Sequence, residues 1–82
     1  MGTKELLLLL NQKAHKQGYS YVIQYNYQYS QTYNQLYNKI LLIEYNHSKL
    51  VRKIRLKNDF HTIEQLTILL NKYTNHEAEK SD

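Results

Sequence analysis

The spacing of hydrophobic positions at the start of the chain is that of a helix. Some members of a run of five leucines, together with the alanine four residues after the run, recur at three- and four-residue intervals, which predicts one buried helix face. Thr3 suits the N-cap, Glu5 suits the positive end of the helix dipole, and Gly18 suits the left-handed position after the last turn. We therefore predict a helix from about residue 4 to residue 17. The residues expected inside are Leu6, Leu7, Leu10 and Ala14.

Two segments with strand character follow this helix. In YSYVIQYNYQYS, residues 19–30, tyrosine or isoleucine fills each odd position, and Val22 is the one apolar residue among the even positions. This strict two-residue period and the many tyrosines are typical of a β-strand. After the turn-like SQTYN, the largely apolar QLYNKILLIEY, residues 35–45, predicts a second strand.

A third strand is predicted by KLVRKIRLK, residues 49–57, where apolar and basic residues alternate. Leu50, Ile54 and Leu56 share one side of it, and Arg52 is a misfit on that apolar side. The short NHS between the second and third strands contains the asparagine of a tight turn, so these two strands form a hairpin.

The last periodic segment, NDFHTIEQLTILLNKY, predicts a second helix that Asn58 or Asp59 can cap. Its expected apolar face consists of Ile63, Leu66, Leu69, Leu70 and Tyr73. The predicted fold class is α+β, in the order αβββα, with both helices packed on one face of a three-stranded antiparallel sheet. We expect this domain to occupy residues 1–75 and the acidic residues 76–82 to form a flexible tail.

Composition and charge narrow the class of protein. The 82 residues suffice for one small domain, and the absence of cysteine excludes disulfides and thiolate metal sites. We expect a soluble, intracellular protein that does not enter a membrane, because no signal-peptide pattern is evident. The net charge is +4, and residues 39–57 hold six basic residues against one acid, Glu44. This balance fits a polyanion such as nucleic acid, and it is also common in ordinary domains.

The end of the first predicted helix carries a resemblance to a known family. LNQKAHKQG, residues 10–18, is similar to the LNExxQKxG pattern of the double-stranded RNA-binding domain, and the αβββα order over residues 3–75 resembles that family's topology. Gln12 stands where the family commonly has glutamate, and His15 where it has glutamine. The positions that match or fit are Leu10, Asn11, Ala14, Lys16 and Gly18.

The resemblance implies binding of double-stranded RNA by shape, over about 16 base pairs and two successive minor grooves. It assigns minor-groove contacts to Gln12 and His15 and to the loop between the first two strands, which has SQTYNQ in place of the family's Gly-Pro-x-His. It assigns phosphate contacts to the start of the second helix, where DFHTIEQ replaces a basic KKxAK-like run. The loop residues expected to contact RNA are Ser30, Gln31, Thr32 and Asn34, and those at the second helix are Lys57 and His61.

The departures from the family keep other functions open. Asp59 and Glu64 add negative charge where phosphate is expected, which favours a degenerate member that dimerises or docks on a protein. A small phage-type inhibitor with this element order is a further alternative. We expect the basic side of residues 49–57, with Lys53 and Arg55, to contribute little to RNA binding, since the resemblance places the open sheet face away from RNA.

The tyrosine stripe and the surplus leucines are candidates for a protein interface. Strand aromatics most often pack in a core, and they also serve as stacking platforms for single-stranded bases or as interface residues. Exposed leucines beside such a strand face would form an apolar patch. The residues assigned to this interface are Leu8, Leu9, Tyr25 and Tyr27.

No pattern for catalysis or metal binding is present in the sequence. We find no paired carboxylates within one element, and His15, His47, His61 and His76 lack a metal-ligand spacing. We therefore expect no enzyme activity, no metal, no cofactor and no small-molecule substrate. The expected partner is double-stranded RNA, or alternatively a protein, including a second copy of this chain.

Overall fold

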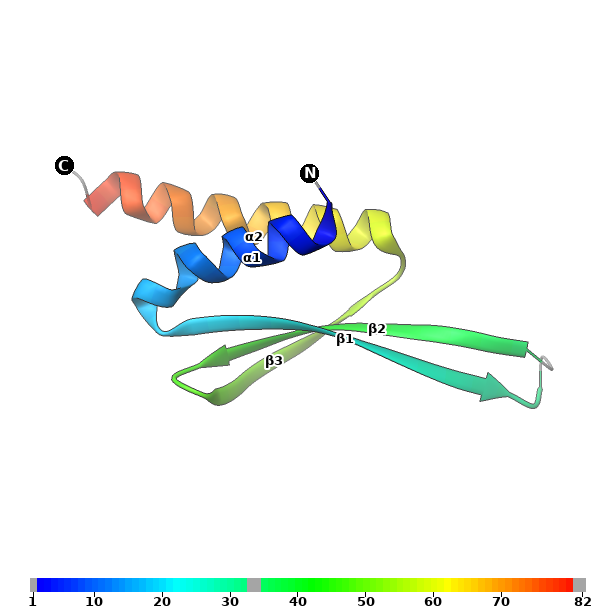
Figure 1. The fold of residues 1–82 in the computed structure, drawn as a ribbon. Helices are drawn as coiled ribbons and strands as arrows, with labels where there is room; N and C mark the ends of the chain where they lie inside the picture. Colours follow the sequence, from blue (N-terminus) through cyan, green and yellow to red (C-terminus); the bar gives the residue numbers. More distant parts are fainter. Residues whose placement is uncertain (1, 33–34, 81–82) are drawn as a thin grey trace.

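Two helices and three strands make up the fold (Figure 1). The computed structural model describes residues 2–32 and 35–80, with the side chains at 27, 28, 30, 35–38 and 76–80 outside the description. The α+β class and the order αβββα predicted from the sequence are confirmed. The elements are α1 (Thr3–Ala14), followed by a 3-10 turn (His15–Gln17), β1 (Tyr19–Ser30), β2 (Gln35–Asn46), β3 (Lys49–Leu56) and α2 (Asp59–Lys80).

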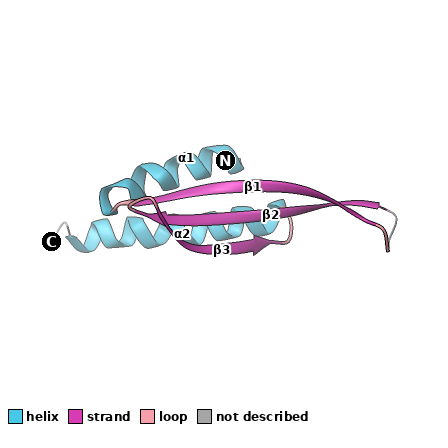
Figure 2. Cartoon of the chain, turned by 90° about the horizontal axis from the view of Figure 1, so that it is seen from below, coloured by secondary structure: helices cyan, strands magenta, loops and turns pink. Residues whose placement is uncertain are grey.

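The helices form one layer and the sheet forms the other. The antiparallel sheet has the order β1-β2-β3, and both helices lie on the same face, α1 beside β1 and α2 beside β3 (Figures 1 and 2). The core lies between the layers, so the outer sheet face has no helix over it. The most buried side chains of this core are Leu10, Ala14, Tyr21, Leu42, Leu56, Leu66 and Tyr73.

The buried face of α1 follows the sequence pattern. Leu6, Leu10 and Ala14 are buried, and Leu7 is partly buried against the core. The five leucines therefore divide into buried and more exposed members, because only one side of α1 can face the sheet and α2.

The buried face of α2 differs at one position. Leu66, Leu69 and Tyr73 are buried as predicted, but Ile63 is 38% exposed. Thr62 takes the inner position instead, with its hydroxyl donating to the Asn58 carbonyl oxygen at 3.0 Å. A helical rotation of about 100° per residue places residue 63 beyond the face that residues 62, 66, 69 and 73 share.

A β-bulge places Leu50 on the opposite side of β3 from the one predicted. Glu44 pairs with Arg52, whereas the next residue, Tyr45, pairs with Leu50, so Val51 is an extra residue in β3. Because a shift of one residue moves side chains to the opposite face, Leu50 lies with Tyr45 on the outer face and is 55% exposed. The prediction that Leu50 shares the side of Ile54 is therefore wrong.

Two tight turns join the elements at one end of the sheet. Gly18 has φ 80°, the left-handed conformation predicted for it, and its carbonyl oxygen accepts a hydrogen bond from the His47 N–H at 2.8 Å. His47 and Ser48 also have positive φ, as the type I′ turn of a two-residue hairpin requires. A Cβ atom at residue 18 would collide with the His47 ring, so this position needs glycine for both conformation and space.

The β1–β2 hairpin extends past the rest of the domain. The β2–β3 pairing ends at Ile40 and Leu56, while β1 and β2 stay paired as far as Ser30 and Gln35. Residues 26–30 and 35–39 thus form a two-stranded ribbon, which projects beyond the helices (Figure 1). The radius of gyration is 15.0 Å, against about 12 Å for a compact domain of this length.

The second helix is longer than predicted. It continues to Lys80, so residues 76–80, which we assigned to a flexible tail, are helical. The reason is local, because no proline or glycine interrupts this stretch and its glutamate, alanine and lysine residues favour helix. Residues 81–82 lie outside the description.

Asn11 attaches α1 to the outer edge of β1. Its Nδ2 donates to the Tyr21 carbonyl oxygen at 3.0 Å, and its Oδ1 accepts from the Tyr21 N–H at 2.8 Å. Nδ2 also donates to the Leu7 carbonyl oxygen at 3.0 Å. The amide thus pairs with both main-chain groups of one edge residue, as a neighbouring strand would. Asn11 matches the RNA-binding family in sequence, and here its side chain has a structural role.

Replacing Asn11 with alanine should destabilise the fold by about 1–3 kcal/mol, since it removes the partners of two part-buried backbone groups. Urea denaturation followed by circular dichroism measures this change. Gln12→Ala, at the adjacent exposed amide, should stay within about 0.5 kcal/mol of the native protein. Equal effects of the two substitutions would contradict the role of the Asn11 amide in attaching α1 to β1.

Candidate nucleic-acid interface

A buried chain of hydrogen bonds holds the one acidic side chain of the sheet, Glu44, on the face toward the helices. Glu44 of β2 is 5% exposed, and its Oε2 accepts a hydrogen bond of 2.5 Å from the Tyr21 hydroxyl. Its Oε1 accepts from Arg52 Nε at 3.1 Å. The Tyr73 hydroxyl lies 2.6 Å from that of Tyr21 and donates to it, because Tyr21 gives its only proton to Glu44. Arg52, the misfit of the sequence pattern, thus faces inward to neutralise Glu44.

The two tyrosines that hydrogen-bond in series to Glu44, Tyr21 and Tyr73, are held in the neutral form. Burial and the hydrogen bond to Glu44 raise the pKa of Tyr21 far above its ordinary value. Burial also raises the pKa of Tyr73. The physical cause is that a phenolate would lie in a poorly solvated site beside a carboxylate.

The first pair of predicted contact residues is brought together. Gln12 and His15 are both exposed and lie at the C-terminal end of α1 and the turn that follows. They are three residues apart, so they share a face of the helix. They line a shallow hollow above the start of β1, whose other lining residues are Leu8, Asn11, Tyr19 and Ser20.

The loop residues lie at the far end of the molecule. Gln31 and Thr32 are exposed at the tip of the ribbon, whereas the Ser30 side chain and Asn34 lie outside the described residues. The twelve residues of β1 rise by about 3.3 Å each, so roughly 36 Å separates the two ends of this strand. The hollow at the end of α1 and the tip are therefore separate contact points.

The start of α2 is built around its cap. Asn58, one of the two predicted capping residues, accepts from the His61 N–H through Oδ1 at 2.8 Å. The His61 ring in turn accepts from the Lys57 N–H through Nδ1 at 3.0 Å, so this nitrogen is occupied. The Lys57 side chain is exposed, and exposed Asp59 places negative charge in the first turn, as expected.

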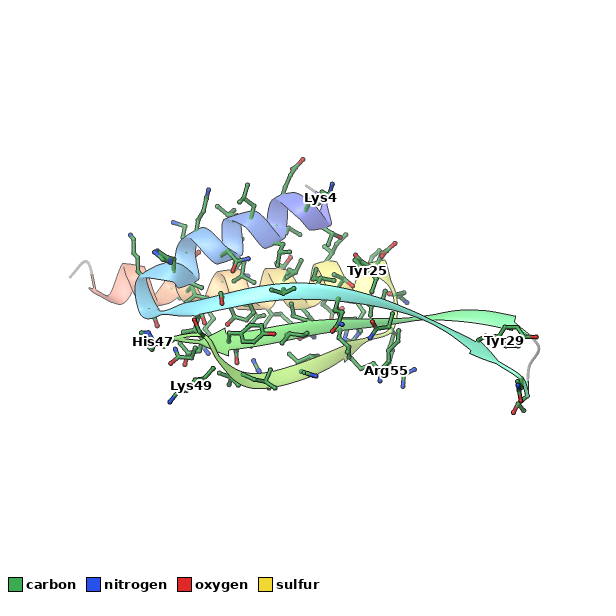
Figure 3. The ribbon with its side chains drawn as sticks, turned by 60° about the horizontal axis from the view of Figure 1, so that its bottom comes forward. Lys4, Tyr25, Tyr29, His47, Lys49 and Arg55 are labelled. Carbon is green, nitrogen blue, oxygen red and sulfur yellow. The ribbon has the colours of Figure 1, made fainter. Side chains whose placement is uncertain are left out.

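The tyrosines of β1 divide into buried and exposed positions. Tyr19 and Tyr21 pack against Tyr73, with ring centroids 5.9 and 6.1 Å away. Tyr25, in the last three-stranded row of the sheet, is 48% exposed, and Tyr29, on the ribbon that no helix covers, is 57% exposed (Figure 3). The Tyr27 side chain lies outside the description.

The predicted interface leucines differ from each other. Leu8 is 62% exposed, whereas Leu9 is half-buried. A third apolar residue, Phe60 in the first turn of α2, is 83% exposed, which sequence periodicity did not single out. These residues add apolar surface to the helix layer.

Comparison with protein-family models, curated proteins and solved structures gave no match to this chain. Among the side chains that the structure describes, no three or more histidine and acidic groups gather as metal ligands would. Neither helix combines the length and apolar character needed to cross a bilayer over the residues that the structure describes.

Alkaline pH should destabilise the protein through Tyr21 and Tyr73. Their pKa values are raised in the folded state, so above about pH 10 the unfolded chain releases protons that the folded chain retains. The free energy of unfolding should fall by up to about 1.4 kcal/mol per pH unit for each tyrosine. Urea denaturation between pH 8 and about 11 tests this.

Tyr73→Phe should make that pH slope shallower, because it removes one of the two buried hydroxyl groups. The same slope in the native protein and the Tyr73 variant would show that Tyr73 titrates normally in the folded state.

Proposed function

We propose that this domain binds double-stranded RNA by recognising its shape. The αβββα order, the similarity of residues 10–18 to the family's helix end and the net charge of +4 support this function. The observation that carries the proposal is the elongated arrangement of the three predicted contact segments.

These segments follow one another along the molecule. The end of α1 lies at one end, the start of α2 lies further along, and the ribbon projects at the other end (Figure 1). The longest dimension is 56 Å, while 16 base pairs extend roughly 54 Å at the B-form rise of about 3.4 Å and less in the A-form. The molecule is thus long enough to reach two successive minor grooves.

The side chains at each segment suit different parts of a duplex. Gln12 and His15 offer hydrogen-bonding groups to 2′-hydroxyls and base edges, and so do Gln31 and Thr32 at the tip. Lys57 offers one charge to a phosphate, and neighbouring Asp59 opposes it. We therefore expect weak binding that depends strongly on salt.

The domain should bind a duplex RNA of about 20 base pairs more tightly than DNA of the same sequence, because it contacts 2′-hydroxyls and A-form grooves. Fluorescence anisotropy at two salt concentrations measures this preference. Changing Gln12 and His15 together to alanine should lower RNA affinity about tenfold. Lys57→Glu should also lower affinity and reduce the salt slope by about one.

Lys72→Glu is the matched control for the Lys57 substitution, since Lys72 is exposed further along α2 and has its ammonium group 5.8 Å from the Tyr73 ring centroid. It should retain most of the RNA affinity. Equal affinity for RNA and DNA, or no binding at low salt, would overturn the proposed function.

Protein docking is a second candidate, favoured by the large exposed fractions of Leu8 and Phe60. Two apolar side chains this exposed are of the type found at partner sites. Self-association through the helix layer is the form of docking that the isolated chain can reveal.

Under this second candidate, Leu8→Gln with Phe60→Gln should abolish self-association in analytical ultracentrifugation. Stability should change by less than about 1 kcal/mol, because both side chains are exposed. A monomeric native protein at all concentrations would reject self-association through this surface.

A further inference from the structure

The sheet face opposite to the helices, called the open face here, is organised in rows that the strand pairing defines. One row consists of Gln24, Leu41 and Arg55, and the next of Val22, Ile43 and Lys53. Lys39 of β2 lies opposite Asn26, two residues along from Leu41 and on the same face. Three cations from two strands thus gather around Leu41 and Ile43.

The open face has a single sign of charge. No acidic residue occurs between Glu5 and Glu44, or between Glu44 and Asp59. Glu44 itself faces the core and is paired with Arg52. Among the residues that the structure describes, no acid forms an ion pair with the three cations of the open face.

The centre of the open face is packed although no helix covers it. Ile43 is only 5% exposed, so the side chains around it, with Lys53 directly opposite, shield it from water. Val22 and Leu50 remain about half-exposed nearby, at 47% and 55%. Lysine and arginine can lay their apolar stems over such a surface and keep their charged ends in solvent. In Figure 3, which brings this side forward, the Arg55 side chain extends away from the helices.

The cations also form a track toward the start of α2. Lys53 and Arg55 are two residues apart on one side of β3, about 6.6 Å along the strand. Lys57 follows after two more residues, where β3 leads into α2. A regular series of cations at this spacing suits the successive phosphates of a nucleic-acid strand.

We infer that the open face binds the phosphate backbone of nucleic acid through Lys39, Lys53 and Arg55. The inference rests on the proposed function for its nucleic-acid partner. It departs from the family resemblance, which places this face away from RNA and implies little contribution from Lys53 and Arg55. A polyanion is the partner that a surface with only positive charges attracts. The packed strip beneath the cations limits their conformational freedom and so reduces the entropy lost on binding.

The test compares two double variants with the same change in charge. Lys53→Gln with Arg55→Gln should lower affinity for a 20-base-pair RNA duplex about tenfold and reduce the salt slope by about 1–2. Lys4→Gln with Lys72→Gln, whose lysines are exposed on the helices, should change affinity less than about twofold. Circular dichroism melting checks that each variant is folded.

A footprint on the native protein gives an independent reading. Bound duplex should protect Lys39 and Lys53 from acetylation, as measured by mass spectrometry, while Lys4 and Lys72 stay reactive. Native affinity in the open-face variant, or unprotected Lys39 and Lys53, would overturn the inference.

The failures of the two proposals are distinguishable. Loss of RNA binding only in the Gln12 and His15 variant rejects the open face and keeps the proposed function. If RNA and DNA bind equally and the Lys53 and Arg55 variant loses both, RNA recognition is rejected and the open face stands. No binding of either duplex by the native protein rejects both.

Discussion

The buried carboxylate of Glu44 is the constraint on which the rest of the structure depends. Taking a charge out of water costs several kcal/mol unless it keeps its partners, and here the partners come from separate elements. Tyr21 belongs to β1, Arg52 to β3, and Tyr73 reaches the same site from α2. A shift in either strand pairing, or a rotation of α2, would leave one of these hydrogen-bonding groups around Glu44 without a partner. The register of the sheet and the position of the second helix are therefore coupled.

The bulge beside Glu44 reconciles this constraint with the sequence of β3. Arg52 must lie opposite Glu44 to reach the carboxylate, while Leu50 lies opposite Tyr45. The extra residue, Val51, allows both pairings within one strand. As a result the single acid near the centre of the sheet turns inward with one arginine, and no acid among the described side chains pairs with the outer cations. Core stability and surface charge thus have a common origin.

The sequence pattern was sufficient for the element order, because β1 and most of β3 alternate, β2 is a largely apolar run, and α1 keeps a helical spacing. It failed at Leu50, since a bulge leaves no mark in an alternating sequence, and at Ile63, since Thr62 is small and polar but finds a backbone acceptor inside. Arg52 was a usable signal, because a charged residue on an apolar strand side requires a buried partner. The absence of acidic residues between Glu5 and Glu44, and between Glu44 and Asp59, was an equally usable signal for a positively charged sheet face.

The candidate site could be predicted only where its residues are close in sequence. Gln12 and His15 lie together because one helix turn joins them, whereas the separation of the ribbon tip depends on how far β1 and β2 extend beyond β3. The row of Lys53 beside Ile43 depends on register, which alternation alone does not determine. The ribbon also has a consequence for local unfolding of the domain. Its backbone lacks a third strand and a helix cover, so resistance to amide hydrogen exchange should decline from the clamped end of β1 toward the tip, dividing one small domain into regions of unequal local stability.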